Sequence, residues 1–119
     1  MNKINLGEKY ELIDQHWDPK IIGEVNDMHV KLAKIKGDFE FHTHQDEDEL
    51  FYVYKGQITM KYRNSEEIIN EGEMIIVPRG VEHKPYAEEE AHILLFESKE
   101  TVNTGDKENE FTKLKEDWI

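Results

Sequence analysis

Hydrophobic and polar residues alternate along much of the chain with the period of two that is typical of β-strands. Ile58, Met60 and Tyr62 alternate with polar neighbours, which indicates a strand with one buried side and one solvent-facing side. Other segments are continuous apolar runs, which predict strands buried on both faces. The strands predicted from these patterns include residues 28–35, 39–44, 50–54, 58–62, 74–77 and 92–96.

Turn sequences separate the predicted strands at intervals of roughly eight to twelve residues, the spacing expected of an all-β sandwich or barrel. The segment 78–80, Pro-Arg-Gly, fits a type I turn with proline at the second position and glycine at the fourth. We find no clear helical periodicity before residue 98, and we interpret residues 10–13 as a short strand. The chain therefore predicts a single all-β domain.

The last segment, residues 98–119, is charged and poor in apolar residues. Phe111, Leu114 and Trp118 would allow a short helix or arm to dock onto the body of the domain. A partly mobile tail is the alternative interpretation.

Composition narrows the range of partners and compartments. The chain has 119 residues, no cysteine and a formal net charge of −12. This charge argues against nucleic acid and anionic membranes as partners, because both require clustered lysine and arginine. The absence of cysteine excludes disulfides and thiol catalysis. The N-terminus has no apolar signal segment, and the apolar runs are far shorter than the ~20 residues needed to cross a bilayer, so we expect a cytoplasmic protein.

Three histidines and one glutamate form the candidate chemical site. His42 and His44 are two positions apart, so in an extended segment both imidazoles point to the same side. Glu49 follows across an acidic turn, and His83 comes just after the predicted Pro-Arg-Gly turn. Three imidazoles and one carboxylate are a ligand set suited to a divalent first-row metal. The acidic residues of the turn compete with Glu49 as the fourth ligand, but its place at the start of a strand favours it.

These residues resemble the two sequence motifs of the cupin family. The first motif runs from a glycine through His-x-His and a glutamate to a second glycine, and the second runs from a glycine through Pro-x-Gly to a histidine. The matching positions are Gly37, His42, His44, Glu49, Gly56, Gly72, Pro78, Gly80 and His83. The chain departs from the pattern twice. Gly37 is one residue closer to His42 than usual, and Ala87 replaces an asparagine that is not a metal ligand.

The resemblance covers residues 28–97 and is closest in kind to small, single-domain, mannose-6-phosphate isomerase-like cupins. It implies a jelly-roll-like double-stranded β-barrel core over 28–97, with an N-terminal arm or edge strands at 1–27 and a tail at 98–119. It also implies that the three histidines and Glu49 are metal ligands inside the barrel, and that the protein is a homodimer that binds a small molecule.

The predicted ligand set also bears on the identity of the metal. Four protein ligands on an octahedral ion leave two positions for a chelating hydroxycarbonyl or enediol compound, or for a substrate together with O₂. Tetrahedral zinc would have no open position. A catalytic role therefore favours Mn²⁺, Fe²⁺, Co²⁺ or Ni²⁺, or Zn²⁺ with an expanded coordination shell.

Further candidate site residues come from weaker patterns. Glu40 shares strand parity with the His-x-His pair, so it is either a general base or an exposed residue at the start of the strand. His92 lies in the last apolar strand, either as an acid–base group or as a packed histidine. The candidates for substrate binding, with packing or solvent exposure as the alternative, are Tyr52, Tyr62 and Arg79.

Three functions are compatible with these features. The first is an isomerase, epimerase or lyase in which the metal acts as a Lewis acid on a small hydroxycarbonyl or sugar-like compound. A sugar phosphate fits less well, because the sequence offers few basic residues near the site. The second is a metal-dependent dioxygenase, and the third is a non-catalytic module that binds a metal or small ligand. Because fold does not determine function, the residues of the site must decide among them.

Overall fold

The structure is a computed structural model that describes residues 1–108, 112 and 115–119. In this part of the chain, one short helix precedes seven strands. The elements are α1 (Leu6–Glu11), β1 (Lys20–Val25), β2 (Met28–Asp38), β3 (Glu49–Lys55), β4 (Gln57–Lys61), β5 (Glu66–Asn70), β6 (Met74–Val77) and β7 (Lys84–Ser98). The content is nearly all β, as the alternating sequence predicts.

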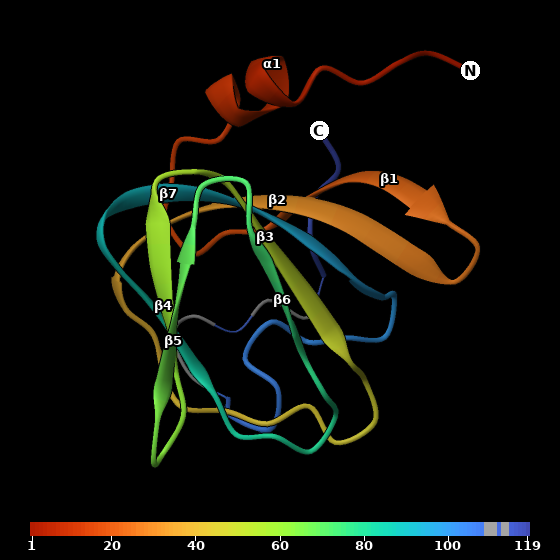
Figure 1. Ribbon diagram of the computed structural model, residues 1–119. Coiled ribbons are helices and arrows are strands. Elements are labelled where there is room, and N and C mark those ends of the chain that lie inside the picture. Colours follow the sequence, from red (N-terminus) through yellow and green to blue (C-terminus); the bar gives the residue numbers. More distant parts are fainter. Residues whose placement is uncertain (109–111, 113–114) are drawn as a thin grey trace.

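The strands form an antiparallel sheet that folds over on itself into a jelly-roll-like barrel (Figure 1). The main path runs in the order β1-β2-β7-β3-β6. The β4–β5 hairpin joins this path through the first residues of β7, where Thr59 pairs with Tyr86 and Lys61 with Lys84. Strand β7 therefore links the two halves of the barrel, and the predicted fold class is confirmed.

The core lies between the two halves of the barrel. Alternate residues of β7 point into it, so Ala91, Ile93 and Leu95 are buried while their neighbours are more exposed. Side chains from β2, β3, β4, β5 and β6 complete the same cluster. Burial of this apolar surface is the main favourable contribution to the free energy of folding.

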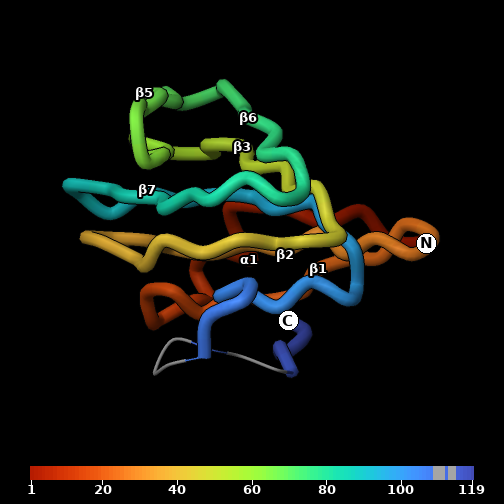
Figure 2. Tube along the Cα trace, turned by 90° about the horizontal axis from the view of Figure 1, so that it is seen from below, coloured from red at the N-terminus to blue at the C-terminus, as the bar shows by residue number. Residues whose placement is uncertain are grey.

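A second cluster covers the outer face of the sheet, where our prediction of a strand at residues 10–13 is wrong. Tyr10 and Glu11 form the end of helix α1, and Leu12 caps it. The helix begins after Asn5, whose side chain accepts a hydrogen bond from the Glu8 amide at 3.0 Å. Leu6, Tyr10 and Ile13 have the helical spacing i, i+4, i+7 and pack with β1 and β2. Figure 2 shows α1 and β1 beside β2, on the side away from β5 and β6.

Two predicted strands also differ from the structure. Residues 39–44 form no ladder, and His42 alone makes an isolated bridge to His83. Strand β6 exists as predicted but is not fully buried, since Met74 is 57 % exposed and Ile76 53 % exposed. Among the described strands, β6 pairs only with β3 and so forms an edge of the sheet, which explains this exposure.

The C-terminal segment returns to β1. Ile21 donates a hydrogen bond to the Asp117 carbonyl at 2.9 Å and makes a bridge with Trp118. The described residues after Ser98 form turns and no helix, while Phe111 and Leu114 lie outside the described residues. In the described part of the chain, no helix is long and apolar enough to span a membrane.

Candidate metal centre

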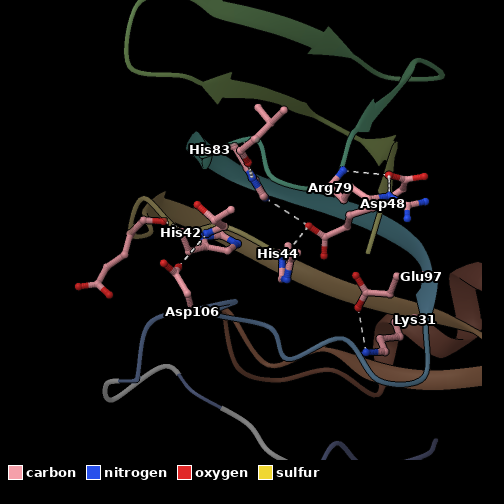
Figure 3. Close-up of polar contacts among 12 residues, drawn as sticks. Lys31, His42, His44, Asp48, Arg79, His83, Glu97 and Asp106 are labelled. Atoms are coloured by element: carbon pink, nitrogen blue, oxygen red, sulfur yellow. Dashed lines mark hydrogen bonds and ion pairs between the residues drawn. The ribbon is translucent and has the colours of Figure 1, made fainter. Parts of the chain in front are cut away.

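Four buried side chains meet at one end of the barrel: His42, His44, Glu49 and His83. One nitrogen or oxygen from each lies within 4.8 Å of the others. Figure 3 shows the three histidines converging from the 39–44 segment and from the start of β7. This geometry could hold one metal ion, in the place where the sequence predicts one.

Backbone hydrogen bonds bring the two histidine segments together. His42 and His83 exchange two of them, each 3.0 Å between nitrogen and oxygen. The Gly80 amide donates to the His44 carbonyl at 2.8 Å. Gly80 has a φ of 79°, a conformation that glycine adopts without strain. The Pro-Arg-Gly turn therefore fixes the His-x-His segment against the start of β7.

Two of the imidazoles are oriented by a hydrogen bond from Nδ1 to a backbone carbonyl two residues earlier in the chain. His42 Nδ1 lies 2.9 Å from the Glu40 carbonyl, and His83 Nδ1 lies 2.9 Å from the Val81 carbonyl. A carbonyl oxygen only accepts, so each Nδ1 carries the proton and each Nε2 keeps a free electron pair. In both rings, the atom that can bind a metal is therefore Nε2.

The electrostatics of the centre favour a neutral His42 and an ionised Glu49. Burial, with a contribution from His83, lowers the pKa of His42 to about 4. Burial opposes ionisation of Glu49, but its interactions with Glu97, His44 and His83 outweigh this effect and hold its pKa well below the usual value. Burial also opposes protonation of His44, but the nearby Glu49 carboxylate outweighs it and raises the pKa of His44. A neutral His42 and an ionised Glu49 are the protonation states that a divalent cation requires.

The surroundings of His44 Nε2 also fit a metal ion, independently of the sequence motif. His44 Nε2 is buried and has no hydrogen-bond donor or acceptor in good geometry among the described residues. It lies 3.3 Å from Glu49 Oε1, and His83 Nε2 lies at the same distance from that oxygen. A buried nitrogen left without a partner is costly, and a cation shared with Glu49 would satisfy it.

A buried ion-pair chain stands behind Glu49. Glu97 is the register partner of Glu49 on β7 and forms an ion pair with Lys31 at 2.8 Å. Lys31 also contacts Glu116 of the C-terminal segment, and Figure 3 shows Lys31 and Glu97 below the histidines. Burial and the nearby Glu49 carboxylate raise the pKa of Glu97 well above the usual value. Glu97 can therefore hold a proton beside Glu49.

A small, mostly apolar cavity opens directly beside the centre. It has a volume of about 40 Å³. His42, Glu49 and Glu97 form its polar end, while most of the other lining residues are apolar. Trp17 of the N-terminal segment and Asn103 of the C-terminal segment also line it. A molecule bound here would touch the candidate metal ligands at one end and hydrocarbon along its sides.

The C-terminal segment also holds the ligand loop in place. The Thr43 amide donates to the Asp106 carboxylate at 2.9 Å, and the Asp106 amide donates to the Thr43 carbonyl at 3.0 Å. Gly105 packs so closely that a Cβ there would clash with the Thr43 carbonyl and lie 3.0 Å from the His42 ring. The position of His42 and His44 thus depends on residues far away in the sequence.

The weaker candidates lie outside the cavity lining as the structure describes it. Glu40 is exposed, and His92 lies on the outer side of β7, where it stacks on Tyr10 and contacts Glu90 at 3.1 Å. The alternation of side chains along β7 explains why His92 points outward, because its neighbours Ala91 and Ile93 occupy the inward positions. The other three candidates were predicted to bind substrate. Tyr52 and Tyr62 are partly buried, and the exposed Arg79 side chain contacts Asp48.

Sequence reasoning missed four residues near the centre: Trp17, Lys31, Glu97 and Asn103. A signal existed for Glu97, which follows Ile93 and Leu95 at the inward parity of β7. Lys31 is the corresponding case on β2, as a charged residue in an apolar strand. Nothing in the local sequence of Trp17 or Asn103 marks them, because both reach the cavity through long-range packing.

A comparison with protein families agrees with this geometry. The model described as "Cupin domain" matches residues 28–97, more than half of the chain. The chain belongs to the cupin family. A solved structure of a cupin-2 domain protein from Shewanella frigidimarina is 43 % identical, with a TM-score of 0.80, and the match covers 81 % of this chain and 94 % of that one.

Two curated relatives of this cupin match over shorter parts of their length. The uncharacterised protein YdbB of Bacillus subtilis is 34 % identical over 64 residues, which are 53 % of this chain and 57 % of YdbB. A protein of Saccharolobus solfataricus named "Putative dioxygenase SSO1533" is 29 % identical over 89 residues, which are 73 % of this chain and 23 % of that protein. The match to each relative therefore spans less than two thirds of its length.

Proposed function

We propose that this cupin is a metal-dependent enzyme of the isomerase, epimerase or lyase type that acts on a small hydroxycarbonyl compound. His42, His44, Glu49 and His83 would hold one divalent ion, of Mn, Fe, Co, Ni or expanded-shell Zn. The observation that carries the proposal is that two members of this buried cluster, His42 and Glu49, line a mostly apolar cavity. A purely structural metal site would not require a cavity beside it.

The bound metal would supply Lewis-acid polarisation of a carbonyl oxygen. The chain itself would do the rest. Apolar walls exclude water and orient the substrate, and the Nδ1 bonds of His42 and His83 keep both rings in one tautomer. Glu97 lines the same cavity, and its raised pKa allows its carboxyl group to hold the proton that such a reaction moves.

The test is turnover of a panel of small hydroxycarbonyl compounds by the metal-loaded protein, followed by NMR. We expect turnover that chelation abolishes and that metal restores. Glu97→Gln should lower kcat by about a hundredfold, a typical loss of rate when an acid–base group is removed. The metal content should stay unchanged. Glu71→Gln is the matched control, because Glu71 is exposed and lies outside the cavity lining. Equal turnover with and without metal would contradict the proposal.

A metal-dependent dioxygenase is the second candidate. The name of the Saccharolobus relative and the apolar lining of the cavity, which suits O₂, both favour it. An oxygen electrode separates the two candidates, since isomerisation consumes no oxygen. Substrate-dependent oxygen uptake in the Fe²⁺-loaded protein would replace the first proposal with the second.

We also propose that the protein is a homodimer. Ile68 of β5 and Met74 and Ile76 of β6 are more than half exposed on neighbouring edges of the sheet. Such an apolar patch on an edge is the kind of surface that a second copy covers.

A further inference from the structure

The cavity beside the candidate centre is closed in part by a residue from outside the cupin core. Trp17 precedes residues 28–97, the part that matches the family, yet it lines the cavity together with His42 and Glu49. Its ring stacks on Phe39 with centroids 4.7 Å apart and planes at 18°. Phe39 in turn packs edge-on against the His42 ring at 5.4 Å. An aromatic wall therefore leads directly to one of the candidate ligands.

Several contacts hold Trp17 in this place. Its backbone has a φ of 60°, which non-glycine residues seldom adopt. The Trp17 amide donates to the Lys34 carbonyl at 2.9 Å, and its indole Nε1 donates to the Lys36 carbonyl at 3.0 Å. The neighbouring His16 contacts Glu90 at 2.8 Å. A backbone conformation of this kind persists only where the surroundings fix it, so the wall is a built feature of the site.

The chemistry of the lining limits what can bind. Among the described lining residues there is no lysine or arginine, and Glu49 and Glu97 supply two carboxyl groups. A phosphate or carboxylate group here would be buried without a cationic side chain, which is strongly unfavourable. A polyhydroxylated chain would also lose hydrogen bonds to water without finding enough polar partners.

We propose that Trp17 is a specificity-determining residue, selecting substrates in which an uncharged, apolar body follows the hydroxycarbonyl group. This inference rests on the proposed function, because the hydroxycarbonyl end would face His42 and Glu49. The apolar end would lie against Trp17 and Phe39. Sugar phosphates and polyhydroxylated sugars are therefore poor substrates.

Three small compounds that share one chelating group test the proposal. These are 1-hydroxy-2-butanone, dihydroxyacetone, which has the same number of heavy atoms, and dihydroxyacetone phosphate. Binding to the Ni²⁺-loaded protein is followed by isothermal titration calorimetry, which applies equally to variants that lack the Trp17 indole. We expect 1-hydroxy-2-butanone to bind about tenfold more tightly than either of the others, since one apolar group is worth about that factor.

Substitutions at Trp17 then locate the preference. Trp17→Ala should lower the affinity for 1-hydroxy-2-butanone about tenfold and reduce the preference over dihydroxyacetone to within about twofold. Trp17→Phe keeps an aromatic wall and should retain most of the preference. Trp118→Phe is the matched control, because Trp118 packs edge-on against His29 and does not line the cavity. An unchanged preference in Trp17→Ala, or binding of the phosphate compound as tight as that of 1-hydroxy-2-butanone, would overturn the inference.

A separate measurement distinguishes this failure from failure of the proposed function. In the metal-free protein, dissolved xenon should bind in the apolar cavity and shift the Trp17 indole N–H in a saturable way. No saturable shift at Trp17 would overturn the inference whether or not metal binds. Absence of metal from the wild-type protein, with the xenon response intact, would overturn the proposed function while supporting the apolar wall.

Discussion

Lys31 is a buried cation whose position is explained only by its two acidic neighbours. Its side chain is 1 % exposed, and its ammonium group contacts Glu97 and Glu116. Neither a cation nor a carboxylate is stable in a core unless it is paired, so the three groups depend on one another. Since Glu97 also lies beside Glu49, this chain connects the stability of the core to the candidate metal centre.

Removal of the Lys31 charge should therefore destabilise the protein. Lys31→Met leaves Glu97 and Glu116 buried without a cation, and we expect a loss of about 3–5 kcal/mol in the free energy of unfolding. Urea denaturation measures this loss. A triple variant that adds Glu97→Gln and Glu116→Gln should regain most of it, because no unpaired charge is left. A Lys31→Met variant as stable as the wild type would show that the ion pairs contribute nothing to the free energy of unfolding.

The pKa of His42 predicts how metal-free stability depends on pH. In the folded protein this pKa is about 4, and in the unfolded chain it is near 6.5. Between these values the unfolded state binds the proton and the folded state does not, so stability falls as pH is lowered from 6.5 to 4. The full contribution is about 3.5 kcal/mol, from 2.5 pH units at about 1.4 kcal/mol each. About 3 kcal/mol of it is lost between pH 6.5 and pH 4, because titration is only half complete at each end of this range.

A variant isolates this contribution from the other titrating groups. Glu97 acts in the opposite direction, because its raised pKa favours the folded state as pH falls. The useful quantity is therefore the difference in unfolding free energy between wild type and His42→Gln, measured at pH 6.5 and pH 4 in chelator. Wild type should lose about 3 kcal/mol more than the variant. Equal losses would mean that His42 is not held neutral by burial.

At the scale of elements, the strands that the sequence predicted well are those with clear alternation. Strand β4 has the predicted alternation of buried and less buried residues. The apolar runs at 50–54 and 92–96 form strands as predicted, but in β3 and β7 only alternate residues are fully buried, because each strand has one inward face. The helix at 6–11 was missed, since two apolar residues in so short a segment, Leu6 and Tyr10, gave no clear period. The exposure of β6 could not be foreseen either, because edge position is set by the topology and not by local sequence.

The candidate site was predicted better than its surroundings. His42, His44, Glu49 and His83 share a pattern of local spacing and turn residues that the sequence displays. Trp17 and the Lys31–Glu97–Glu116 chain, by contrast, reach the site by long-range packing. The same holds for the turn around Gly105, which is more than sixty positions from the histidines that it contacts.

Substitution of Gly105 tests that contact. Gly105→Ala places a methyl group against the Thr43 carbonyl and the His42 ring, so it should displace the ligand loop. Gly72→Ala is the matched control, because Gly72 also has a positive φ but no atom within 4 Å of the added methyl group. Both should lose about 1 kcal/mol of stability from backbone strain. Only Gly105→Ala should also weaken metal binding, measured by competition with a chelator. Equal metal affinity in the two variants would contradict the account of the loop.

At the scale of the whole molecule, the exposed edge strands predict self-association. Ile76→Lys places a charge in the apolar patch formed by Ile68, Met74 and Ile76, and should shift the protein from dimer to monomer in sedimentation velocity. Leu12→Lys is the control, since Leu12 is equally exposed but lies beyond helix α1. A wild-type protein that stays monomeric at high concentration would contradict the homodimer.

The domain as a whole brings three imidazoles and one carboxylate to one end of the barrel, and metal content tests this claim most directly. Elemental analysis of protein purified without an affinity tag should find about one divalent ion per chain in wild type and in the control His92→Ala. His42→Ala and His83→Ala should each empty the site, because each substitution removes one of the two Nε2 ligands whose rings are held by backbone carbonyls. Stoichiometric metal retained in both of these variants would contradict the account.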